Sequence, residues 1–165
     1  MHPFIIVISK SGVSQPLFTK IAVAIDGSEN SMRAAEMAVA MAERHKAEVV
    51  GVFVANIDQY LQSFGLYRVS YPTSVQKKIE EARTEANQWF GTIKQRADLA
   101  GVKFHGQVVD TPLSVVAAIV SFAEEEKADL IMIGTRGRTG FAKLVMGSVA
   151  SGVVTYAACS VLVIR

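Results

Sequence analysis

The chain has 165 residues, of which 50% are hydrophobic and 19% are charged, and its formal net charge is +2. This composition suits one domain with a sizeable core and excludes a largely disordered chain. The nearly balanced charge argues against nucleic acid as a partner, because a nucleic-acid binder usually carries a basic patch or stripe.

The beginning of the chain and its cysteine content bear on where the protein works. No apolar stretch reaches 18 residues, so no membrane span is expected, and the apolar run Phe4–Ile8 is too short for a signal peptide. Residues 1–19 are an extension: a tail, an added strand or residues foreign to the natural protein, and the sequence does not decide between them. The single cysteine, Cys159, suits a reducing compartment, which predicts a cytoplasmic protein, and its apolar setting favours a buried structural thiol over a reactive one.

The first part of the domain alternates a strand, a helix and a second strand. Lys20–Ile25 is a continuous apolar run, which is typical of a strand buried on both faces. After the turn Asp26–Ser28, alanines and methionines at spacings of three and four predict a helix, with Ser28 or Asn30 as its N-cap. Glu48–Ala55 predicts the second strand.

The same alternation continues after a long connection. Asn56–Pro72 shows no clear period, and we favour a surface loop over a mobile lid there. Thr73–Ala100 predicts a long helix with a partly buried tryptophan, and Val102–Val109 predicts the third strand. Pro112 suits the first turn of the next helix, and Asp129–Ile133 predicts the fourth strand.

A glycine-rich loop, a helix over Lys143–Ala157 and a last strand over Ser160–Ile164 complete the predicted domain. Strands that alternate with helices predict a parallel sheet covered on both faces, with right-handed crossovers. Ligands of such sheets bind beyond the carboxyl ends of the strands. The candidate binding groups at those ends are Asp26, Val54, Asp110 and Gly134.

The loop from Gly134 to Ser148 is the segment with the clearest chemistry. Glycines at 134 and 137 let the backbone turn sharply and approach a ligand, and free backbone N–H groups in such a loop form an anion site. Three basic side chains, Arg136, Arg138 and Lys143, add positive charge. A purely structural turn would explain the first two glycines but not the pair Gly147-Ser148, so the pattern favours a phosphate or nucleotide. It is neither the P-loop nor the dinucleotide fingerprint.

The spacing of Gly134, Gly137, Gly147 and Ser148 is G-x2-G-x9-G-S, which resembles the ATP-binding motif of the universal stress protein family. Three further segments are similar to that family's first strand and turn, its fourth strand and loop, and its closing strand: Ile21–Ser28, Ala128–Gly137 and Ala158–Arg165. The resemblance covers Lys20–Arg165, with residues 1–19 outside it. The usual glycine before the third helix is replaced in Val109–Pro112, and Ser160 stands where the family often has proline.

The resemblance implies a single α/β domain of the Rossmann-like, adenine nucleotide alpha hydrolase-like type, with a five-stranded parallel sheet in the order 3-2-1-4-5 and helices on both faces. It also implies an ATP site, with ADP and AMP not distinguished from ATP, and Mg²⁺ or Mn²⁺ on the phosphates. The metal ligands stay unknown. The residues that would hold the nucleotide are Ala24, Ile25, Asp26, Val54, Gly134, Thr135, Gly137, Arg138, Gly147, Ser148 and Val149.

Three functions remain open at this point. The leading one is a nucleotide-dependent regulatory module in stress response, which is a homodimer through the C-terminal strand and acts on an unknown protein partner. The second is a slow ATP hydrolase or phosphotransferase with Asp110 as its acidic group, and the third is a nucleotide-independent interaction module. No membrane or nucleic-acid partner is expected. Purely structural interpretations of two site residues also remain open: Asp26 could be a turn cap alone, and Arg138 could be a solvated loop residue.

Overall fold

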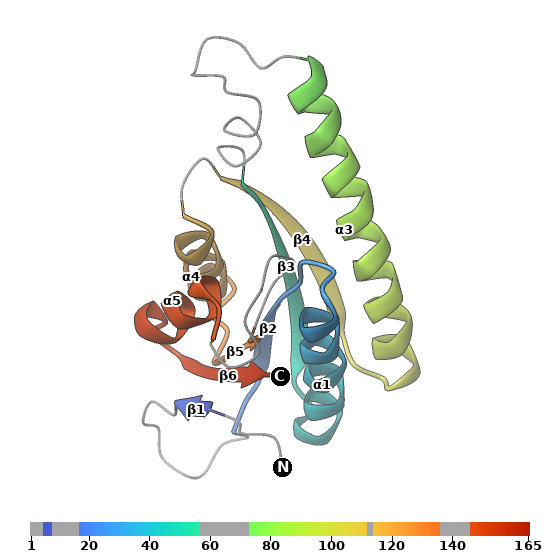
Figure 1. The fold of residues 1–165 in the computed structure, drawn as a ribbon. Helices are drawn as coiled ribbons and strands as arrows, with labels where there is room; N and C mark the ends of the chain where they lie inside the picture. Colours follow the sequence, from blue (N-terminus) through green and yellow to red (C-terminus); the bar gives the residue numbers. More distant parts are fainter. Residues whose placement is uncertain (1–4, 8–16, 57–72, 112–113, 136–145) are drawn as a thin grey trace.

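The computed structural model describes residues 5–7, 17–56, 73–111, 114–135 and 146–165. Strands and helices alternate along most of the chain, as the sequence predicts (Figure 1). The elements are β1 (Ile5–Val7), β2 (Lys20–Ala24), α1 (Glu29–His45), β3 (Glu48–Asn56), α3 (Thr73–Leu99), β4 (Phe104–Thr111), α4 (Val115–Glu125), β5 (Leu130–Gly134), α5 (Ser148–Tyr156) and β6 (Ser160–Ile164).

The sheet has the order β1-β6-β5-β2-β3-β4. The five strands from β2 to β6 are parallel to one another, and their order is the predicted 3-2-1-4-5. The order reverses between β2 and β5. After β2, the chain adds β3 and β4 on one side of that strand and then β5 and β6 on the other side. Ligand sites of such sheets lie at this switch point, beyond the carboxyl ends of the strands.

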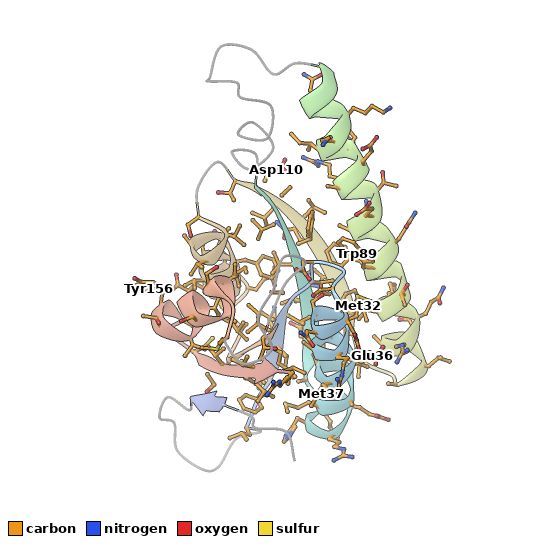
Figure 2. All side chains as sticks on the ribbon, in the orientation of Figure 1. Met32, Glu36, Met37, Trp89, Asp110 and Tyr156 are labelled. Carbon is orange, nitrogen blue, oxygen red and sulfur yellow. The ribbon has the colours of Figure 1, made fainter. Side chains whose placement is uncertain are left out.

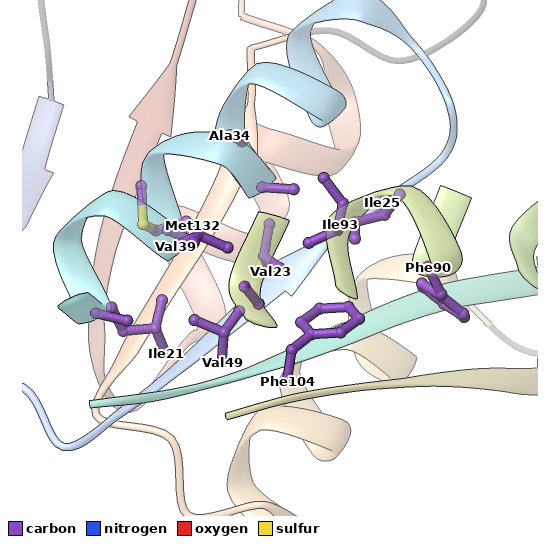
Figure 3. Close-up of a cluster of buried hydrophobic side chains, with 14 of the residues drawn as sticks. Ile21, Val23, Ile25, Ala34, Val39, Val49, Phe90, Ile93, Phe104 and Met132 are labelled. Atoms are coloured by element: carbon purple, nitrogen blue, oxygen red, sulfur yellow. The ribbon is translucent and has the colours of Figure 1, made fainter. Parts of the chain in front are cut away.

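Helices cover both faces of the sheet, which explains the apolar runs without alternation. α1 and α3 lie on one face and α4 and α5 on the other (Figure 1). Along β2, Ile21 and Val23 pack into the core under α1 and α3, whereas Ala22 packs under α4 and α5. Figure 3 shows part of the first core, where Phe104 and Ile93 close the space between the sheet and α3.

The first helix follows its predicted signals. Ser28 is the N-cap and its Oγ accepts a hydrogen bond from the Ser31 N–H, while Lys46 ends the helix in a left-handed conformation. Three alanines at a spacing of four, Ala34, Ala38 and Ala42, are buried against the sheet, and such small side chains let α1 approach the strands closely.

Three predicted elements begin two or more residues further along the chain than expected, and the boundaries predicted for the other elements differ by at most one residue. The third predicted strand lies two residues further along, at Phe104–Thr111. The next helix begins at Val115 with Ser114 at its N-cap, so Pro112 is not its first residue, and Pro112 itself lies outside the described residues. The last helix begins at Ser148 rather than Lys143, because Met146 and Gly147 are not helical. At both late helix starts the residue before the helix, Ser114 or Gly147, has an extended backbone and makes no side-chain cap hydrogen bond.

The N-terminal extension contributes a strand to the sheet. Ile5–Val7 pairs antiparallel with Val161–Val163, on the side of β6 that β5 leaves open (Figure 1). An unpaired apolar edge strand is a template for pairing with other chains. β1 therefore covers the edge that the sequence predicts as a dimer contact.

Within the described part of the chain, no helix is long and apolar enough to cross a membrane.

Candidate functional site

A pocket opens at the predicted switch point, where β2, β3 and β5 end. Its cavity volume is about 110 Å³, it is open to solvent on one side, and most of its surface is apolar. Six residues predicted from the sequence line it: Ala24, Ile25, Asp26, Val54, Gly134 and Val149.

The turn after β2 brings the pocket its carboxylate. The Ser28 N–H and hydroxyl both donate to Asp26 Oδ1, at 3.0 and 2.6 Å, so the carboxylate is held in one orientation. Gly27 has a φ of +78°, a left-handed conformation that favours glycine. Asp26 is thus a turn residue, as its purely structural interpretation predicts, and it also lines the pocket.

Ser31 ties this turn to the first turn of α1. Its hydroxyl donates to the Ser28 carbonyl oxygen at 2.9 Å and accepts from the Asp26 N–H at 3.2 Å. Ser31 is buried and also lines the pocket. Because this buried hydroxyl both donates and accepts a hydrogen bond within the turn, Ser31 fixes the turn.

Gly134, the last residue of β5, is close to the same helix. A Cβ at Gly134 would lie 2.9 Å from both the backbone carbon and the Cβ of Asn30. Any side chain would therefore push the start of α1 away from the sheet. The glycine that begins the predicted loop is required by this close approach within the protein, in addition to any ligand contact.

The other end of the loop is a helix N-terminus. α5 begins at Ser148 after Gly147, which offers no side-chain cap, and the Ser151 N–H donates to the Gly147 carbonyl oxygen at 2.9 Å. The N–H groups of the first helical residues, Ser148, Val149 and Ala150, precede this bond and have no intrahelical acceptor. Together with the helix dipole they favour an anion at this point.

Thr135 lies between the pocket and this helix. Its N–H donates to the Ile164 carbonyl oxygen at 2.6 Å, and its own carbonyl oxygen accepts from the Gly147 N–H at 2.8 Å. Its Oγ1 is buried and has no hydrogen-bond partner among the described residues. An unpaired buried hydroxyl is costly, and a polar group of a ligand would satisfy it.

The predicted site residues therefore fall into three groups. Six line the pocket, and three more, Thr135, Gly147 and Ser148, form the adjoining loop end and helix start. Gly137 and Arg138 lie outside the described residues, as do Arg136 and Lys143.

Asp110 is the candidate that the structure does not bring to the pocket. It pairs in register with Ala55, on the face of the sheet that α3 covers, and its Oδ2 accepts from Arg83 Nη2 of that helix (Figure 2). It is not among the pocket residues in the described part of the chain. The prediction that groups it with the other strand ends was wrong because β4 is an edge strand, separated by β3 from the switch point between β2 and β5.

Sequence reasoning missed half of the lining: Ser31, Val52, Phe53, Val115, Ile119 and Ile133. Val115 and Ile119 are four residues apart on α4, a spacing that the helical period could have supplied. Phe53 was not singled out, although it precedes Val54 at a strand end. Only the folded position of α1 reveals that Ser31 reaches the pocket.

Two further chemistries find no support in the described residues. No group of three His, Cys, Asp or Glu side chains there could hold a metal ion. Burial raises the pKa of the half-buried Cys159 thiol, and such a thiol is less reactive than an exposed one. The sequence predicts a buried structural thiol here, and the structure shows a thiol that is only partly buried.

Comparisons with known proteins agree with the fold. A universal stress protein of Methanocaldococcus jannaschii is 35% identical over 150 residues, which cover 90% of this chain and 83% of that protein. A universal stress protein from Archaeoglobus fulgidus, solved in complex with dAMP, superposes with a TM-score of 0.64 at 23% identity, covering 90% of this chain and 99% of that one. A further solved universal stress protein, in complex with cAMP, superposes with a TM-score of 0.61 at 22% identity, covering 90% of this chain and 97% of that one.

These solved structures share the fold, and nucleotides are bound in both of them. The family model described as Universal stress protein family matches residues 17–165, which includes every strand and helix that lines the pocket. On this match, and on the likeness to the archaeal relative, the chain belongs to the universal stress protein family.

Proposed function

We propose that the protein is a regulatory module that binds an adenine nucleotide, ATP in the first place, in the pocket at the ends of β2, β3 and β5. The observation that carries this proposal is the buried Thr135 hydroxyl, which has no partner among the described residues and lies between an apolar slot and an uncapped helix N-terminus. An apolar slot suits a base, and an uncapped helix start suits phosphate. Relatives of the same fold are solved with cAMP and dAMP, which supports an adenine nucleotide.

Each part of the pocket has a proposed role. Ala24, Ile25 and Val54 accommodate the adenine, and Asp26 accepts hydrogen bonds from the ribose or the base. The phosphates reach Thr135 and the N–H groups at the start of α5, which are those of Ser148 and Val149. Gly134 and Gly147 keep the backbone near the ligand, and Gly137 and Arg138, from the loop between them, complete the proposed set.

A divalent cation, Mg²⁺ or Mn²⁺, fits this site only through the nucleotide. In the described lining, Asp26 is the one carboxylate, and Ser28 already donates twice to its Oδ1. Mg²⁺ is commonly held by phosphate oxygens, water and few protein ligands. We therefore propose that the ion neutralises phosphate charge while the protein holds the nucleoside.

We propose binding rather than turnover as the main function. Asp110, the acidic group considered for hydrolysis, is paired with Arg83 and directed to the α3 face. The bound nucleotide would favour one conformation or one assembly that a protein partner recognises in stress response, which requires different affinities for the two states. Because of the single cysteine, the cytoplasm remains the proposed location.

The proposed assembly is a homodimer through β6. β1 covers three residues of that strand's edge, Val161–Val163, so a second copy can pair there only after β1 leaves. The domain unit proposed for this assembly is residues 20–165, with residues 1–19 as an extension that controls access to the edge.

Calorimetric titration with ATP and with AMP, with and without Mg²⁺, tests the proposal. Ala24→Leu adds three carbons inside the adenine slot and should weaken both nucleotides about tenfold or more, since overfilling a packed space costs roughly 1–3 kcal/mol. The matched control is Ala40→Leu on the exposed side of α1, which should bind like the parent. A parent protein that binds neither nucleotide at millimolar concentration would sink the proposal in favour of a nucleotide-independent module.

A further inference from the structure

The chain's only tryptophan does not line the nucleotide pocket, but it packs against residues that line or adjoin the pocket. Trp89 lies on the side of α3 that faces the sheet, and its indole reaches the turn after β2 (Figure 2). We infer that Trp89 is a positioning residue, which holds both the Asp26–Ser28 turn and Phe53 in the geometry that the nucleotide needs. This inference rests on the proposed function.

The contact with the turn is made at Gly27. A Cβ at that residue would lie 2.3 Å from Trp89 Cζ2 and 2.4 Å from Cε2, so the indole occupies the space that any side chain would take. The left-handed φ of +78° already favours glycine at this position. Two independent requirements therefore make residue 27 a glycine, and one of them is the tryptophan.

The second contact is with Phe53, which lines the pocket. The two rings meet edge to face, with centroids 5.6 Å apart and an interplanar angle of 77°. This arrangement is one of the favourable geometries of aromatic pairs. The indole thus supports the pocket at two places, because Asp26 precedes Gly27 and Phe53 is on the next strand of the sheet.

Contacts outside the pocket fix α3 itself, so the indole has a defined position. Phe90, the next residue, packs on Gly106 so closely that a Cβ there would lie 2.3 Å from its ring. Arg83 pairs with Asp110 of β4, and Arg96 Nη2 lies 3.0 Å from Glu36 Oε1 of α1. A helix anchored at three points presents Trp89 to a turn that is itself only a few residues long.

A contact made behind a binding residue acts on affinity through that residue. Without the indole, the turn keeps its internal hydrogen bonds from Ser28 and Ser31, so it still forms. What changes is its position relative to Phe53, and hence the place of the Asp26 carboxylate in the pocket. Small displacements of binding groups have large effects on a ligand whose contacts must be made together.

The test compares two neighbouring aromatic residues of one helix. Trp89→Leu removes the contacts with Gly27 and Phe53, whereas Phe90→Leu removes the contacts with Gly106 and Phe104, neither of which lines the pocket. Trp89→Phe keeps an aromatic ring. For each variant the unfolding midpoint in urea and the Kd for ATP and for AMP are measured.

We expect Trp89→Leu to weaken both nucleotides about fivefold to tenfold, Trp89→Phe to lie between it and the parent, and Phe90→Leu to bind within about twofold of the parent. Phe90 is the more deeply buried residue, so its variant should lose at least as much stability. A merely structural role would instead make affinity follow stability across the variants. Should Trp89→Leu not fold, Trp89→Phe against Phe90→Leu supplies the same comparison.

The parent protein provides an independent readout, because all tryptophan emission comes from Trp89. Emission should change with added ATP along the same isotherm as the heat. Equal affinities for the tryptophan variants and the parent would overturn this inference alone. A parent that binds neither nucleotide would overturn the proposed function and this inference with it.

Discussion

The Gly147 N–H donates a hydrogen bond to the Thr135 carbonyl oxygen, 2.8 Å away. This bond joins the two ends of the glycine-rich loop, and it places the Thr135 hydroxyl beside the first turn of α5. The hydroxyl is buried without a partner among the described residues. The loop ends are thus held by the backbone, while a side-chain donor is left for a ligand.

Replacement of this hydroxyl should change stability and affinity in opposite directions. Thr135→Val keeps the shape of the side chain and removes an unpaired polar group, so we expect the free energy of unfolding to stay equal or to rise by about 1 kcal/mol. Nucleotide affinity should fall about fivefold or more, because the phosphate loses a donor. Urea unfolding and calorimetric titration measure the two effects.

Thr155→Val is the matched control for that substitution. Its hydroxyl is on the exposed side of α5 and donates to the Ser151 carbonyl oxygen at 2.8 Å. We expect no change of nucleotide affinity in this variant. If Thr135→Val lowered stability and left affinity unchanged, its hydroxyl would have a structural partner rather than a ligand.

Asp110 supports packing between α3 and β4 rather than chemistry. Asp110→Asn removes the charge opposite Arg83 and should cost about 0.5–1 kcal/mol, since both side chains are more than a third exposed. Affinity for ATP and any phosphate release should remain at the level of the parent. A loss of measurable phosphate release in this variant would restore the hydrolase interpretation.

The pairing of β1 with β6 should limit self-association. Ile6→Pro removes a backbone donor within the three-residue strand, and proline is poorly tolerated inside a ladder. We expect this variant to associate more strongly than the parent in sedimentation experiments over a concentration series, because the edge of Val161–Val163 becomes open. Ile6→Ala, which keeps the N–H, is the control. Identical association of all three proteins would argue against a role for β1.

The ion pairs at the amino ends of the strands should shape the acid limb of stability. Lys20 Nζ lies 2.7 Å from Glu48 Oε1, and hydrogen bonding to Lys20 lowers the pKa of Glu48 below its ordinary value of 4.5. The resulting stabilisation is present above that value and is lost as the pH falls through the lower folded-state pKa. Glu48→Gln should therefore lose less stability than the parent between about pH 5 and pH 3.

Urea unfolding at several pH values measures this difference, with Glu125→Gln on the exposed side of α4 as the control. The control should follow the parent. A parent and Glu48→Gln with the same acid dependence would mean that the carboxylate's pKa is the same in the folded and unfolded chains.

The sheet could be predicted from the sequence because most of its strands are continuous apolar runs. Ser160–Ile164 is apolar after its first residue and buried throughout, and its predicted bounds are those observed. Ser28 could be predicted as a cap because its residue type and position favour that role. The starts of α4 and α5 could not be predicted in the same way, because neither Ser114 nor Gly147 makes a side-chain cap hydrogen bond.

The site was predicted where it depends on strand ends and missed where it depends on packing between elements. Asp26 and Val54 follow from the rule for parallel sheets. The distant partners do not: Ser31 reaches the pocket only because α1 approaches Gly134, and Trp89 reaches Gly27 only because α3 crosses above β3. The prediction for Asp110 was wrong because a strand end seen in the sequence does not say where that strand lies in the sheet, and β4 is an edge strand.

Backbone amide chemical shifts during titration of the labelled protein with ATP and Mg²⁺ test the central claim most directly, because they report binding and its place together. The account predicts saturable shifts concentrated at Asp26, Val54, Thr135 and Val149, with an indole shift at Trp89 and little change at Glu48 on the opposite end of the sheet. An absence of shifts at millimolar ATP, or shifts confined to residues away from the pocket, would contradict it.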